Sequence, residues 1–116
     1  LKHEYLYKMK SQLTQIIDVS SRLRKYEAIS GYEKNIAYNK KEVNETIPPV
    51  GWSDGEMFRE RFIKVIDDDI RLMDSLSKMD TAGVRYDSSE AVFIIRDRQD
   101  SLMESLDSLI SKVDKE

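Results

Sequence analysis

Few side chains in this sequence could support catalysis or bind a metal. His3 is the only histidine and there is no cysteine, which excludes a disulfide framework, a thiolate metal site and a cysteine nucleophile. Asp67, Asp68 and Asp69 form the one acidic run. Consecutive helical residues point about 100° apart, so we interpret the run as a solvated helix face and not as a metal site. No Ser/His/Asp set, phosphate-binding glycine loop or zinc-ligand spacing is present, and we expect neither an enzyme nor a cofactor.

The composition is typical of an all-helical protein. Of the 116 residues, 40% are hydrophobic and 35% are charged, with only four Gly and two Pro. Such a balance favours helical bundles and coiled coils over sheets. The length predicts one domain spanning residues 1–116.

Charge and hydropathy narrow the expected partners and location. The net charge is -3 with both signs interleaved, so no basic field exists to hold nucleic acid. No apolar run approaches the roughly 18 residues of a membrane span, and the start does not resemble a signal peptide. We therefore expect no membrane span and a cytoplasmic location, with export by a leaderless route as the alternative.

Apolar residues recur at helical spacing over residues 2–46. The first seam repeats every three or four positions, as in a heptad pattern: Leu6, Met9, Leu13, Ile16, Ser20 and Leu23. The phase then slips, and a second set repeats every seven residues: Ile29, Ile36 and Val43. The slip fits either a stutter in one long helix or a break near Gly31. We predict one continuous helix, because no proline follows Gly31 and helix formers resume at once.

The remaining elements follow from the prolines and the next two apolar faces. Pro48 and Pro49 must end the first helix, and residues 48–55 form a loop. Helices are predicted over about 54–79 and 88–115, each with an apolar face. Short turns make neighbouring helices antiparallel. The predicted fold is an all-α, up-down-up helical bundle or hairpin with a long first helix and a Trp-containing interhelical turn.

The predicted helix lengths do not match. A first helix of about 44 residues would be about 66 Å long, whereas the other two reach only about 40 Å. The N-terminal part of its seam would then project as a docking or dimer surface. The predicted partner-binding residues are Leu6, Met9, Leu13, Ile16 and Ile17. In the alternative, a break near Gly31 folds the helix back and buries the seam in a closed four-helix bundle.

Trp52 in the interhelical turn is the most distinctive residue. It either packs across the helix ends as a structural plug or belongs to a family motif. Trp52 with Gly55, followed by Phe58 and Phe62, resembles the WXG100 superfamily. More narrowly, the layout resembles the small helical accessory proteins encoded beside LXG toxins in Gram-positive type VII secretion. The family motif is Trp-x-Gly, and this chain has one residue more between its Trp and Gly.

Two short motifs extend the resemblance. Export in these systems is associated with Tyr-x-x-x-Asp/Glu after the hairpin, and Tyr86 and Glu90 match that spacing. Phe93 and Asp97 match a Phe-x-x-x-Asp pattern that resembles one in toxin-targeting partners.

The resemblance implies a function in protein recognition. It predicts a targeting or chaperone-like partner that binds the helical N-terminal domain of a type VII-secreted toxin, together with a second small helical protein. The alternative is a generic helical adaptor or a self-associating coiled-coil domain, such as a homodimer, without a role in secretion.

Overall fold

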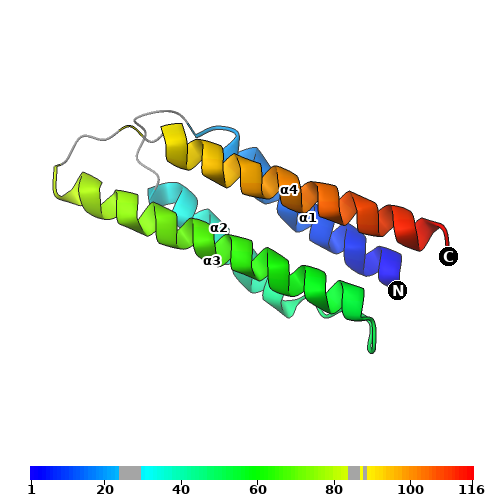
Figure 1. Ribbon diagram of the computed structural model, residues 1–116. Helices are drawn as coiled ribbons and strands as arrows, with labels where there is room; N and C mark the ends of the chain where they lie inside the picture. Colours follow the sequence, from blue (N-terminus) through cyan, green and yellow to red (C-terminus); the bar gives the residue numbers. More distant parts are fainter. Residues whose placement is uncertain (24–29, 84–86, 88) are drawn as a thin grey trace.

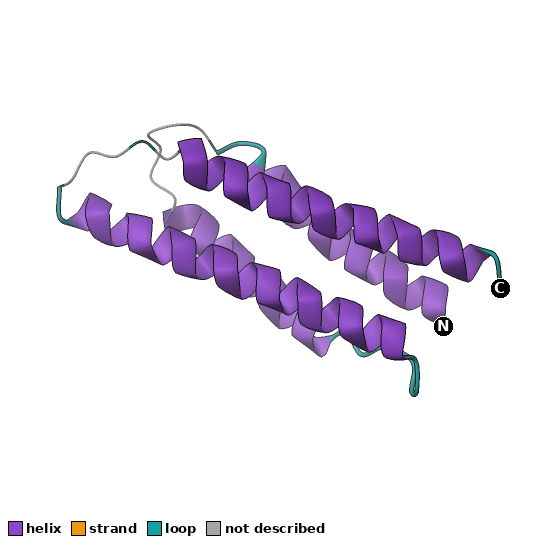
Figure 2. Cartoon of the chain, in the orientation of Figure 1, coloured by secondary structure: helices purple, strands orange, loops and turns teal. Residues whose placement is uncertain are grey.

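The described residues are 1–23, 30–83, 87 and 89–116 of the computed structural model, and most of them are helical. These ranges contain no strand and four helices (Figure 2): α1 (Lys2–Ser20), α2 (Ser30–Glu45), α3 (Ser53–Thr81) and α4 (Ser89–Asp114). The expected all-α class is confirmed. The bounds of α3 and α4 lie within two residues of the predicted ranges 54–79 and 88–115.

The predicted continuous helix over residues 2–46 is wrong. α1 ends at Ser20, α2 begins at Ser30 with Gly31 inside it, and the two helices pack against each other. A single helix would leave the N-terminal seam in water, at a cost of about 1.5–3 kcal/mol for each large apolar side chain. Interrupting the helix loses a few backbone hydrogen bonds, each contributing about 1 kcal/mol net. Burial of the seam therefore outweighs continuity of the helix.

The four helices form an elongated bundle of 54 × 21 × 17 Å. α1 packs mainly on α4 and α2 mainly on α3, with further contacts between α1 and α2 and between α3 and α4. Both chain ends lie at one end of the bundle, beside the turn between α2 and α3 (Figure 1). The core draws on all four helices, and its least exposed side chains include Leu6, Met9, Leu13, Ile36, Val43, Phe62, Ile66, Met73, Leu102 and Leu106.

Arg96 of α4 closes the end of α1. Its Nη2 donates hydrogen bonds to the backbone oxygens of Ser20, Ser21 and Leu23, at 3.2, 2.9 and 3.0 Å. Carbonyls at a helix C-terminus lack intrahelical donors and carry partial negative charge, and the last turn of α1 has no basic residue of its own. The guanidinium supplies both the donors and the charge. Arg96 is half-buried.

Replacing Arg96 by methionine should destabilise the fold, because the side chain keeps its apolar stem but loses the charged donor. We expect the free energy of unfolding to fall by about 1–3 kcal/mol, as measured by urea denaturation. Arg22→Met is the matched control, because Arg22 is exposed and, among the described residues, its ion pair is with Asp18 of α1. Equal effects of the two substitutions would contradict the capping role.

Candidate functional site

The predicted docking seam lies inside the protein. Leu6, Met9, Leu13 and Ile16 are each at most 2% exposed, and Ile17 is partly buried against the same core. α2 and α4 cover α1, so these side chains are not available to a partner. The prediction that they form a partner-binding surface is therefore wrong, because folding back of the first segment turns the seam into core.

The turn that contains Trp52, between α2 and α3, packs against the start of α1. The rings of Tyr5 and Trp52 pack edge to face, 5.9 Å between centroids, and Tyr5 Oη donates a 2.8 Å hydrogen bond to the backbone oxygen of Gly55. Burial raises the pKa of the Tyr5 hydroxyl to about 12, so it keeps its proton as a donor. Phe58 and Phe62, the other residues of the predicted turn motif, lie in the core with ring centroids 6.0 Å apart.

Gly55 is required by the position of the Trp52 ring. A Cβ at Gly55 would lie 2.6 Å from Trp52 Cε3 and 2.9 Å from Cζ3, closer than van der Waals contact allows. The Lys2 ammonium sits 5.2 Å from the centre of the same ring. These contacts favour Trp52 as the plug that closes the turn.

The two export-like motifs have different outcomes. Tyr86 lies outside the described residues, so its pairing with Glu90 is not tested. Phe93 and Asp97 both lie at the surface, with the Phe93 side chain 68% exposed. Both line a groove of about 580 Å³ near the start of α4, together with Leu23, Val92 and Arg96.

The core contains a polar network that the sequence pattern did not predict. Gln99 of α4 accepts a hydrogen bond of 2.6 Å from Ser20 Oγ of α1 and donates one of 2.7 Å to Tyr32 Oη of α2. All three side chains are buried. Burial is the main cause that raises the pKa of Tyr32, and the nearby charge of Asp69 raises it further. The sequence does contain a signal of this network, because Ser20 and Gln99 occupy positions in the apolar seams where hydrophobic residues are expected.

Asp69 is also buried, and its interpretation as part of a solvated acidic face is wrong. Its side chain is 0% exposed and accepts a 2.8 Å hydrogen bond from Arg98 Nη1 of α4. Burial raises the pKa of its carboxyl to about 6, although Arg98 opposes that shift. The position could have been recognised, because Asp69 continues the helical spacing of Phe62, Ile66 and Met73.

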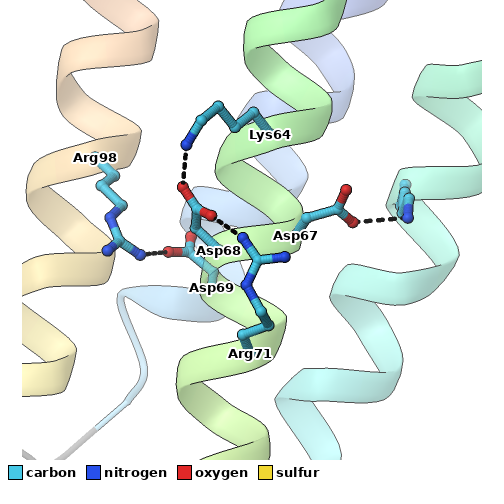
Figure 3. Close-up of polar contacts among 7 residues, drawn as sticks. Lys64, Asp67, Asp68, Asp69, Arg71 and Arg98 are labelled. Carbon is cyan, nitrogen blue, oxygen red and sulfur yellow. Dashed lines mark hydrogen bonds and ion pairs between the residues drawn. The ribbon is translucent and has the colours of Figure 1, made fainter.

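The other two aspartates of the run do lie at the surface, as predicted. Asp67 pairs with Lys40 of α2 at 2.7 Å. Asp68 pairs with Lys64 at 2.9 Å and with Arg71. No two of the three carboxylates share a partner, and they do not converge (Figure 3). Within the described parts of the chain, no three His, Asp or Glu side chains gather closely enough to hold a metal ion.

A groove with exposed apolar side chains lies at the turn end of the bundle. We call it the turn-end groove. It has a volume of about 550 Å³ and is lined by Leu1, Glu4, Tyr5, Lys8, Glu45, Thr46, Ile47, Pro48, Pro49 and Val50. Ile47 and Val50 are 70% and 102% exposed. These two aliphatic side chains therefore face solvent, one on each side of Pro48 and Pro49.

The turn that carries these two residues is well ordered by local contacts. Trp52 N donates to the backbone oxygen of Pro49 at 3.2 Å, and Gly51 between them has φ +77°, a conformation that favours glycine. Val50 therefore stands at the tip of a β-turn. On the other side, Thr46 Oγ1 donates to the backbone oxygen of Glu42 at 2.8 Å.

No protein-family model, curated protein or solved structure matches this chain. The fold therefore defines the class, which is a four-helix protein with a buried polar network. Within the described ranges, no helix is long and apolar enough to cross a bilayer.

The buried carboxyl of Asp69 predicts an unusual pH dependence. Because its folded pKa is raised, the folded state retains a proton between about pH 4 and 6 that the unfolded state releases, and this group lowers stability as pH rises through that interval. Asp69→Asn removes the effect. We expect the difference in unfolding free energy, variant minus wild type, to increase by about 2–3 kcal/mol from about pH 4 to pH 7 in urea denaturation.

Asp68→Asn serves as the control of opposite sign. A hydrogen bond from Lys64 is the main cause that lowers the pKa of Asp68, so its charged form favours the folded state and the corresponding difference should decrease as pH rises. A flat profile for Asp69→Asn would show that the carboxyl is not held in a desolvated site.

Gly55→Ala should destabilise the protein through the Trp52 ring. We expect a loss of about 1–3 kcal/mol in the free energy of unfolding, because the new methyl group overlaps the indole. In a Trp52→Leu background the same alanine should cost much less, because the ring is gone and alanine favours a helix over glycine by about 1 kcal/mol. Additive effects in this double-mutant cycle, followed by far-UV circular dichroism, would rule out the clash.

Proposed function

We propose that this protein is a helical interaction protein that binds a protein partner at the turn-end groove. The observation that carries the proposal is the exposure of Ile47 and Val50 in one groove, on a chain whose first heptad seam is already buried. Isolated apolar side chains on a surface are ordinary, whereas several gathered in a concave site are typical of recognition surfaces.

The geometry of the turn supports a binding role. Pro48 and Pro49 have fixed φ angles, and the turn is further held by the Tyr5, Trp52 and Gly55 contacts. Ile47 and Val50 are thus displayed on a stiff backbone. A preorganised surface loses little conformational entropy on binding, which favours affinity.

The more specific proposal is that the partner is the helical N-terminal domain of a type VII-secreted toxin. Its support is the resemblance around Trp52 and Gly55, together with exposed Phe93 and Asp97 one helical turn apart on α4. A second helical protein or the secretion machinery would then contact the Phe93 surface, at the opposite end of the bundle from the turn-end groove.

The test is co-expression with the helical domain of an LXG toxin encoded beside this gene, followed by size-exclusion chromatography. We expect a stable complex that Ile47→Asp combined with Val50→Asp weakens at least about tenfold, because two apolar contacts are replaced by charges that must be desolvated. Tyr38→Asp is the matched control, because Tyr38 is 63% exposed on α2 and lines none of the grooves described above.

Two results would contradict the proposal. Equal weakening by the control would mean that added charge acts without regard to position. A homodimer of the isolated chain that the double substitution converts to monomer would favour the self-associating alternative. Because the substituted side chains are exposed, unchanged far-UV circular dichroism should accompany the loss of binding.

A further inference from the structure

The turn-end groove continues along the contact between α1 and α2. A second hollow of about 410 Å³ shares three of its lining residues, Lys8, Glu45 and Thr46, and adds Ser11, Gln12 and Glu42. The two hollows therefore adjoin and extend from the Val50 tip to Gln12. The part of α1 along this groove, residues 2–12, is about 16 Å long at about 1.5 Å per residue. That length suits about three turns of a partner helix.

Among the charged side chains that line this combined groove, acidic ones are in excess. The charged side chains include three carboxylates, from Glu4, Glu42 and Glu45, and one ammonium, from Lys8. Glu4 is compensated, since it lies in the first turn of α1, where a helix favours negative charge, and lies 3.9 Å from Lys8. Neither Glu42 nor Glu45 has an ion-pair partner among the described residues.

Glu42 and Glu45 are also placed against the dipole of their own helix. Both lie in the last turn of α2, and that turn contains no basic residue. Negative side chains at a helix C-terminus are unfavourable, because the carbonyl end already carries partial negative charge. No ion pair among the described residues compensates these two carboxylates, whereas a cationic partner would.

Resting on the proposed function, we infer that the groove takes an amphipathic helix whose aliphatic face packs on Ile47 and Val50 and whose flank carries lysine or arginine toward Glu42 and Glu45. Aliphatic contacts supply the burial, and the basic flank sets the orientation and the choice of partner. An acidic helix of the same apolar pattern is rejected by like charge.

The experiment uses two synthetic helical peptides of about 20 residues with the same leucine face, one flanked by lysine and the other by glutamate. Binding to the full chain is measured by fluorescence anisotropy of labelled peptide. We expect the lysine-flanked peptide to bind at least about tenfold more tightly, and Glu42→Lys combined with Glu45→Lys to reverse that preference.

Glu60→Lys combined with Glu104→Lys is the matched control. These glutamates are exposed, lie on α3 and α4 outside the groove, and give the same change in net charge. The control should keep the preference for the lysine-flanked peptide. The Glu42/Glu45 variant should melt at a temperature equal to or above that of wild type, since it removes charges that oppose the α2 dipole.

The outcomes separate this inference from the proposed function. Loss of peptide binding in the Ile47→Asp, Val50→Asp variant, without any charge preference, would keep the groove as the binding site and overturn the basic flank. Equal loss in both charge-reversed variants would also overturn it, because net charge alone would then explain binding. Binding that is insensitive to Ile47 and Val50 would overturn both proposals.

Discussion

The arrangement of the bundle depends on the point at which α1 stops. Two apolar seams follow one another in the first segment, out of phase, and they lie on two separate helices, α1 and α2, that pack against each other. Arg96 stabilises this helix end, because its guanidinium donates hydrogen bonds to three backbone carbonyls near the end of α1. The reversal then brings α2 against α1 and α3. It also brings the turn between α2 and α3 beside Tyr5, where the Trp52 ring is held.

Polar groups within the core determine how the four helices are aligned along one another. The hydrogen bonds through Gln99 join α1, α2 and α4, and the Asp69–Arg98 pair joins α3 to α4. A shift of one helix along another would leave buried donors or acceptors without partners, at about 1–3 kcal/mol each. Apolar burial therefore supplies the driving force, while the polar network favours one alignment of the four helices. A buried Asn in a coiled-coil seam has a comparable effect.

The proposed recognition surface follows from the same reversal. Once both seams are enclosed, the apolar side chains left in water include Ile47 and Val50, which a diproline and a β-turn hold outward. The adjoining end of α2 carries Glu42 and Glu45 where helix electrostatics disfavour them. This end of the bundle thus combines exposed aliphatic side chains with unfavourable helix-end charges, and sites of recognition are where such departures from local stability are expected.

The sequence by itself determined the helical class, the bounds of α3 and α4, the turn at the two prolines and the lack of cysteine chemistry. Periodicity and proline geometry are local properties, and neighbouring residues suffice to read them. Only the tertiary structure decided that the first segment is two helices, that Leu6 and Leu13 are core, and that Arg96 contacts the end of α1. An amphipathic pattern shows that a face will be covered but not by what, because a docking partner and a returning helix satisfy it equally well.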